Sequence, residues 1–236
     1  MNIACWSGPR NLSTAMMYSF AARGDCAVVD EPFYAAYLAA TGLDHPMREA
    51  ILASQETDPE KVISACLAPD ATRPLRYQKH MTQHMLPGIR RDWLERMSNV
   101  FLIRHPARVV ASYSAKREDP TLDDIGFRQQ AELFDLCTSL GQSPVVLDSD
   151  DIRRDPAAML RRLCERLDIA WTERMLSWPA GGHPADGVWA AHWYGAVHRS
   201  TGFAAAEGPL PRLSGPAGDL AEAALPHYER LAAVKI

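Results

Sequence analysis

The chain has 236 residues, of which 47% are hydrophobic and 23% are charged, a composition typical of a globular protein with a sizeable core. Its formal net charge of −4 provides no global basic field for DNA or RNA, so we expect no nucleic-acid partner. Five scattered cysteines argue against a disulfide framework or a zinc site. We find neither the pattern of a signal peptide nor a run of ~18 consecutive apolar residues, so we expect a cytoplasmic enzyme without a membrane partner.

Short apolar runs alternate with longer helical patterns along the chain, as in βαβ units around a parallel sheet. The runs are continuous rather than alternating, which suits strands that are covered on both faces. In chain order we expect a strand over Ile3–Trp6, a helix over Asn11–Ala22, strands over Cys26–Val29, Leu75–Gln78 and Val100–Ile103, a helix over Ala107–Ser114, a strand over Pro144–Leu147 and a helix over Pro156–Leu167. The sequence therefore predicts a three-layer α/β/α fold with a central, mostly parallel sheet of about five strands.

Two stretches lie outside this alternation. Residues from about 34 to 70 have the pattern of a helical insert between the second and third strands. From about 178 to 218, glycine, proline and tryptophan dominate and the periodicity is lost, which is typical of a lid or a binding loop. An alanine-rich helix over Asp219–Val234 follows. We expect a single domain over residues 1–236, in which the irregular segment forms a lid or part of a pocket.

The turn after the first strand has the properties of an anion-binding loop. Such a loop must turn sharply, so that backbone N–H groups and side-chain donors converge at a helix N-terminus. The residues that we expect to do this are Gly8, Pro9, Arg10, Asn11, Leu12, Ser13 and Thr14. The lysine of a standard P-loop is missing, and Arg10 supplies a cation upstream of its position. The alternative is an ordinary strand-to-helix turn that Ser13 or Asn11 caps.

A second basic site follows the fourth strand. Arg104 comes directly after the apolar run that ends at Ile103, and Ser112 lies in the next predicted helix. Ligands of open parallel sheets bind at the carboxyl ends of the strands. An arginine and a hydroxyl group there can hold a phosphate through charge-assisted hydrogen bonds. The alternative is that Arg104 pairs with a nearby acidic side chain.

These motifs together resemble the sulfotransferases that use 3′-phosphoadenosine 5′-phosphosulfate. Residues 9–14 resemble the family's 5′-phosphosulfate loop, 101–113 its 3′-phosphate site, and 146–169 the strand, acidic turn and helix that close its sheet. The resemblance implies a fold like that of P-loop nucleoside-triphosphate hydrolases, with the phosphosulfate as co-substrate and no metal. It places Arg10, Ser13 and Thr14 on the 5′ side and Arg104 and Ser112 on the 3′-phosphate. Leu12 stands where family members usually carry glycine.

Two segments compete to supply the catalytic base. Asp30 and Glu31 follow the second strand, and Glu31 resembles the catalytic glutamate of those members that use a carboxylate. A partly apolar cleft would raise its pKa toward the operating range. The alternative is that both carboxylates cap the next helix, which Pro32 would start. Arg10 would stabilise the charge that develops on the bridging oxygen.

The rival segment follows the third strand. Lys79 resembles, more weakly, a lysine that contacts the leaving group in other members, and His80 and His84 compete for the position of their basic histidine. A histidine in the core or at the surface is the alternative for each. In the late segment, Arg199 resembles a basic loop that closes over the 3′-phosphate. The tryptophan-rich stretch Trp189–Trp193 suits an acceptor pocket or a lid, or else core positions on one helical face.

The expected activity is the transfer of a sulfuryl group to a hydroxyl or amine of a small-molecule acceptor. A P-loop phosphotransferase or ATPase is an alternative, since Ala27–Glu31 reads as an apolar strand that ends in an acidic pair able to hold Mg²⁺. A catalytically silent nucleotide-binding protein of the same fold is another. The identity of the acceptor and the oligomeric state stay open, with a homodimer as one possibility.

Overall fold

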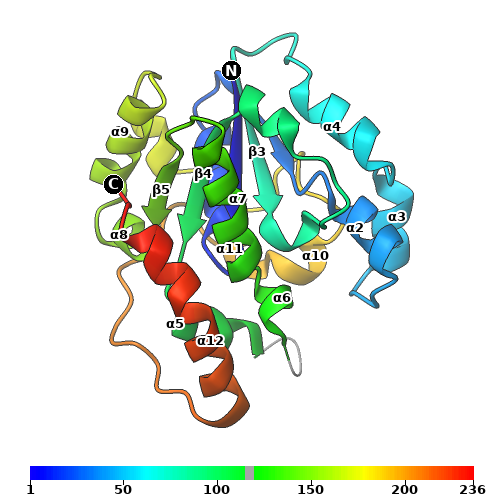
Figure 1. Ribbon diagram of the computed structural model, residues 1–236. Helices are drawn as coiled ribbons and strands as arrows, with labels where there is room; N and C mark the ends of the chain where they lie inside the picture. Colours follow the sequence, from blue (N-terminus) through cyan, green and yellow to red (C-terminus); the bar gives the residue numbers. More distant parts are fainter. Residues whose placement is uncertain (115–119) are drawn as a thin grey trace.

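A five-stranded, entirely parallel sheet forms the centre of the computed structural model, which describes residues 1–114 and 120–236 (Figure 1). The strand order is β2-β3-β1-β4-β5. The strands are β1 (Asn2–Ser7), β2 (Cys26–Asp30), β3 (Leu75–Met81), β4 (Ser98–Ile103) and β5 (Val145–Asp148). Each strand coincides with one of the apolar runs, and the predicted α/β fold is confirmed.

Helices cover both faces of the sheet. One face packs against α1 (Ser13–Ala21), α8 (Ser149–Arg154) and α9 (Pro156–Arg166), and the other against α4 (Pro59–Leu67), α7 (Phe127–Ser139) and α12 (Gly215–Ala232). The two cores separate because successive strand side chains point to opposite faces. In β1, Ile3 and Cys5 join the α1 side, whereas Ala4 and Trp6 join the α7 side.

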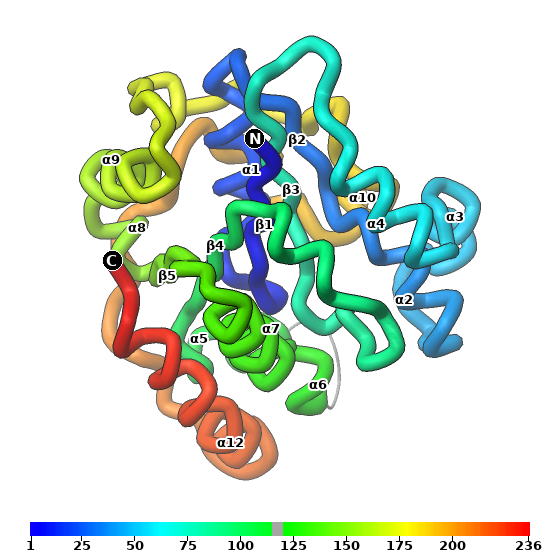
Figure 2. Tube along the Cα trace, turned by 45° about the horizontal axis from the view of Figure 1, so that its top comes forward, coloured from blue at the N-terminus to red at the C-terminus, as the bar shows by residue number. Residues whose placement is uncertain are grey.

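The remaining elements lie at the ends of this three-layer arrangement. Helices α2 (Tyr34–Thr41), α3 (Arg48–Ser54) and α4 lie beyond β2 and β3, whereas α8 and α9 lie beside β5 at the other end (Figure 2). Helix α5 (Pro106–Ser114) packs on α12 and near α6 (Leu122–Ile125). The short 3₁₀ helices are η1 (Thr82–His84), η2 (Asp92–Arg96) and η3 (Glu173–Leu176), and the late segment adds α10 (Ala190–Trp193) and α11 (Gly195–His198).

The structure corrects several predicted boundaries. Helix α1 begins at Ser13 rather than Asn11, because Arg10 and Leu12 have φ values of 64° and 71°, which a right-handed helix cannot contain. The predicted acidic turn after β5 is helix α8, whose N-cap Asp148 accepts a hydrogen bond from the backbone of Asp150 at 2.9 Å. Helix α12 begins at Gly215 instead of Asp219, with a proline in its first turn.

Helix α7 was absent from the prediction, although buried residues recur along it at helical spacing.

All five cysteines are buried and free. None of the helices in the described part of the chain is long and apolar enough to span a membrane. The parallel strands bring the segments after β1, β2, β3 and β4 to one edge of the sheet, where ligands of such folds bind.

Candidate active site

The loop between β1 and α1 curls through two left-handed residues, Arg10 and Leu12. Left-handed residues in such loops turn backbone N–H groups toward one side and create a concave anion site. Leu12 is the N-cap of α1, with φ 71° and ψ 6°, a conformation that glycine adopts without strain and that costs a leucine about 1–2 kcal/mol. Its side chain packs against the core on the α1 face, which offsets part of that cost. The glycine expected at this position is therefore replaced without loss of the turn.

Gly8 has a packing role in the same loop. A Cβ atom at this position would lie 2.4 Å from the carbonyl oxygen of Ile125, closer than any real contact. The loop can therefore approach the end of α6 only because residue 8 is glycine. The part of the loop that lines the neighbouring cavity begins at the next residue, Pro9.

A cavity of about 320 Å³ lies at this edge of the sheet. It brings together most of the residues that the sequence singles out. Those that line it are Pro9, Arg10, Asn11, Leu12, Ser13, Thr14, Glu31, Lys79, His84, Arg104 and Ser112. Its volume is within the range of small-molecule sites.

Two hydrogen bonds join the loop after β1 to the segment after β4. The Nε of Arg10 donates to the hydroxyl of Ser112 at 2.8 Å, and Nη1 of Arg104 donates to the carbonyl oxygen of Arg10 at 2.6 Å. Burial lowers the pKa of Arg10, and the positive charge of Arg104 lowers it further. The two expected phosphate sites are therefore contiguous, and a surplus of positive charge lies between them.

Glu207, from the irregular late segment, lies against Arg104. The Nε of Arg104 donates to Oε2 of Glu207 at 3.2 Å, and Nη2 donates to Oε1. Arg108 and Arg153 lie 3.6 Å and 3.5 Å from the same carboxylate. Burial alone would raise the pKa of Glu207, but the guanidinium groups outweigh it and hold this pKa below its usual value. The alternative interpretation of Arg104, pairing with an acidic side chain, thus describes this structure.

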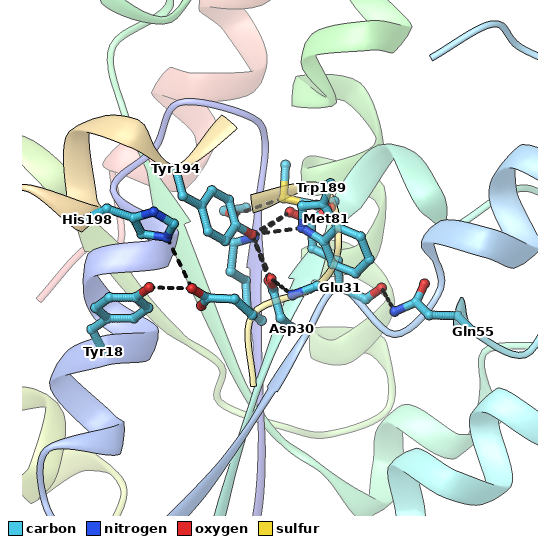
Figure 3. Close-up of polar contacts among 12 residues, drawn as sticks. Tyr18, Asp30, Glu31, Gln55, Met81, Trp189, Tyr194 and His198 are labelled. Carbon is cyan, nitrogen blue, oxygen red and sulfur yellow. Dashed lines mark hydrogen bonds and ion pairs between the residues drawn. The ribbon is translucent and has the colours of Figure 1, made fainter. Parts of the chain in front are cut away.

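A buried charge network lies at the opposite side of the cavity. The ammonium group of Lys79, which is 1% exposed, donates to Asp30 at 2.9 Å, to Glu31 and to the hydroxyl of Tyr194 at 2.6 Å. The Tyr194 hydroxyl also contacts both carboxylates and accepts from Nε1 of Trp189 at 3.0 Å. Figure 3 shows the Tyr194 side chain directed toward Asp30 and Glu31.

In combination, burial and the neighbouring charges raise the pKa values of both Glu31 and Lys79. Burial raises the pKa of Glu31, the charge of Lys79 opposes this, and Asp30 adds to it, with a net increase. Burial lowers the pKa of Lys79, but the two carboxylates outweigh it and raise this pKa above its ordinary value. Glu31 follows the end of β2 with φ 40° and lines the cavity. The carboxylate is held in place rather than capping the next helix.

The two candidate histidines lie in different surroundings, His80 within β3 and His84 in η1 beyond the end of that strand. His80 alternates with Lys79 along β3, so it points into the α7-side core, where its ring stacks on Trp6 at 4.4 Å. Burial lowers its pKa to about 3. His84 lines the cavity from η1, stacked between Tyr34 and Tyr37 at 4.6 and 4.8 Å. Burial also lowers its pKa well below the usual value.

Arg199 is exposed at the end of α11, whereas Ser200 and Gly202 line the cavity. Trp193 lines the cavity, as the interpretation as a pocket or lid expects, whereas Trp189 is buried, as the interpretation as a core residue expects. Among the described residues, no group of three or more His, Cys, Asp or Glu side chains could hold a metal ion.

The sequence analysis missed several residues of the site. These are Glu207, Arg108 and Arg153 at the basic end, and Tyr34, His45 and Tyr194 at the other. Arg153 was readable, because it lies in the segment that resembles the end of the family's sheet. Glu207 and Tyr194 belong to the aperiodic stretch, in which no local signal marks one residue over another.

Comparison with known proteins identifies similar sequences. A family model described as a sulfotransferase domain matches residues 1–235. Branched-chain-amino-acid aminotransferase-like protein 1 of Arabidopsis thaliana is 40% identical over 235 residues, which cover 97% of this chain and 41% of that protein. Protein 2 of the same name and organism is 37% identical over 230 residues, with 97% and 41% covered. This chain thus spans about two fifths of the length of these relatives.

Two solved structures share the fold. The sulfotransferase domain from the curacin biosynthetic pathway aligns with a TM-score of 0.51 at 17% identity, over 94% of this chain and 96% of that one. The sulfotransferase domain from the Synechococcus PCC 7002 olefin synthase aligns with a TM-score of 0.50 at 19% identity, over 94% and 93%. At these identities the likeness concerns the fold.

Proposed function

This chain belongs to the sulfotransferase domain family, and we propose that it moves a sulfuryl group from 3′-phosphoadenosine 5′-phosphosulfate to a hydroxyl or amine of a small-molecule acceptor. The observation that carries the proposal is the contiguous basic site of Arg10, Ser112 and Arg104 at the ends of β1 and β4. A nucleotide with phosphate groups at both its 5′ and 3′ positions needs two such sites side by side. A nucleoside triphosphate leaves the second one unexplained.

The residues present fit this donor. Arg153 carries a buried Nε that has no hydrogen-bond partner among the described residues, and its pKa is lowered by burial and by Arg104 and Arg108, with Glu207 opposing. Clustered guanidinium groups with an unpaired donor are a site for a strongly negative group such as a phosphate. On the 5′ side, the hydroxyl-bearing Ser13 and Thr14 begin helix α1, whose first turn contains no acidic residue. When bound, the donor supplies the sulfuryl group itself.

In the proposed mechanism, Glu31 accepts the proton of the acceptor. Lys79 and Tyr194 both bond to Oε1 of Glu31, and we assign the proton to Oε2. The raised pKa of this carboxylate brings it closer to the operating pH, which favours general-base catalysis. Arg10 stabilises the negative charge that develops on the leaving oxygen, so the proposed reaction needs no metal ion. Residues of the late segment, including Trp193 and Val197, would contact the acceptor from the cavity wall.

The structure disfavours the phosphotransferase alternative. That hypothesis needs Asp30 and Glu31 as a magnesium site, but both carboxylates already bind the ammonium group of Lys79. A magnesium ion would have to displace the buried ammonium group of Lys79 from these carboxylates.

The test combines turnover and binding. Incubation with 3′-phosphoadenosine 5′-phosphosulfate and a library of small alcohols, phenols and amines should give a product heavier by one sulfuryl group, detected by mass spectrometry. Glu31→Gln should lower the rate of product formation about 100-fold or more, whereas Glu173→Gln, at a side chain that is 85% exposed, should leave it unchanged. Calorimetry should show binding of 3′,5′-diphosphoadenosine without magnesium. Magnesium-dependent binding of ATP, with none of the diphosphonucleoside, would overturn the proposal.

A further inference from the structure

We infer that Glu207 is a built-in competitor for the 3′-phosphate: its carboxylate occupies the guanidinium cluster, and a nucleotide binds by displacing it. This inference rests on the proposed function and concerns how the same site selects its ligand. In this arrangement, the 3′-phosphate of the nucleotide is the group that displaces Glu207 from the arginines.

The geometry is that of a ligand in a binding site. Glu207 makes a bidentate contact with Arg104, while Arg108 and Arg153 approach within 3.6 and 3.5 Å. These three arginines come from the end of β4, from α5 and from α8, so three separate elements converge on one carboxylate. The Glu207 side chain is 17% exposed, which leaves a route for exchange with solvent.

A carboxylate does not satisfy this cluster. It has two oxygens, and Nε of Arg153 remains buried without a hydrogen-bond partner among the described residues. A phosphate monoester has three terminal oxygens and carries about −1.5 to −2 charges at neutral pH, against −1 for Glu207. Both groups bind the fork of an arginine in the same bidentate manner. The phosphate is therefore the stronger ligand for the same donors, and Glu207 the weaker one.

The contact also ties the late segment to the cavity. Nη2 of Arg108 donates to the carbonyl oxygen of Gly208 at 2.6 Å, next to Glu207. Upstream in the same segment, Ser200, Gly202 and Ala204 line the cavity wall. Displacement of Glu207 thus loosens a stretch that borders the ligand. A nucleotide without a 3′-phosphate lacks the group that displaces the carboxylate. The contact between Glu207 and the arginines therefore selects for nucleotides that carry a 3′-phosphate.

The test is calorimetric titration of the full chain and of Glu207→Gln with 3′,5′-diphosphoadenosine and with adenosine 5′-phosphate. We expect the variant to bind the diphosphonucleoside about tenfold more tightly, equivalent to ~1.4 kcal/mol of lost competition, with unchanged affinity for adenosine 5′-phosphate. Glu173→Gln is the matched control and should behave as the unmodified chain. Thermal unfolding of both variants verifies that each is folded.

Each outcome decides the matter. Equal affinity of Glu207→Gln and the unmodified chain for the diphosphonucleoside would overturn the inference. Weaker binding by the variant would also overturn it, because Glu207 would then orient the arginines for the phosphate. If neither protein binds the diphosphonucleoside, the proposed function fails, and titration with pyrophosphate decides the inference alone. Tighter pyrophosphate binding by the variant would support competition at the arginine cluster, and unchanged binding would refute it.

Discussion

Removal of the buried ammonium group should destabilise the protein strongly. In Lys79→Met, the carboxylates of Asp30 and Glu31 would lose the cation that lies between them in a region where Lys79 is 1% exposed. Breaking a buried ion pair by deleting one partner costs about 3–5 kcal/mol, because an unpaired charge is left behind. Asp30 keeps its hydrogen bonds from Tyr194 and from the backbone of Gly187, so we expect the lower end of this range.

The loss should depend on pH in a direction fixed by the pKa shifts. Burial already raises the pKa of Glu31, and removal of Lys79, which opposes that effect, would raise it further. A carboxyl group with a folded-state pKa above the unfolded value of about 4.3 destabilises the folded state when ionised. The penalty therefore grows as the pH rises above the unfolded value and shrinks as the pH falls toward 4. The unmodified lysine, with its raised pKa, stays charged across this range.

The assay is urea unfolding at pH 7 and at pH 4.5, with Lys61→Met as a control. Lys61 is 68% exposed and its contact with Glu56 is 3.5 Å, so its loss should change the free energy of unfolding by no more than about 0.5 kcal/mol. The double variant Lys79→Met/Glu31→Gln should recover part of the stability. A loss below 1 kcal/mol at pH 7, or one of equal size at both pH values, would refute the reasoning.

Three further predictions concern the base and the loop. Glu31→Gln should lower kcat about 100-fold or more while the affinity for 3′,5′-diphosphoadenosine changes little, as measured by initial rates and calorimetry; unaltered turnover would assign the base elsewhere. Leu12→Gly should be more stable than Leu12→Ala by about 1 kcal/mol in urea unfolding, because φ is 71° there; the reverse order would contradict the left-handed conformation. Gly8→Ala should cost about 1–3 kcal/mol, because its Cβ would lie 2.4 Å from the carbonyl oxygen of Ile125; an unchanged unfolding midpoint would show that α6 yields freely.

The sequence by itself determined the sheet and the local anchors of the site. Apolar runs defined four strands, because strands covered on both faces tend to be apolar along their length, and a weaker run at Leu75–Gln78, which Arg76 interrupts, marked β3. Arg104 was identifiable because it directly follows such a run, and Arg10 because it lies in the turn after the first one; the ends of parallel strands meet at one edge. Helix α7 was missed, although its apolar residues recur at helical spacing in the sequence.

The tertiary structure alone decided which side chains face one another. His80 and Lys79 are neighbours in the sequence, but the alternation along β3 sends only Lys79 to the cavity. Glu207 meets Arg104 across 103 residues, and Tyr194 meets Asp30 across 164. Both partners come from a late segment without periodicity. Its path is fixed by packing against distant elements, and local sequence patterns carry no record of such contacts.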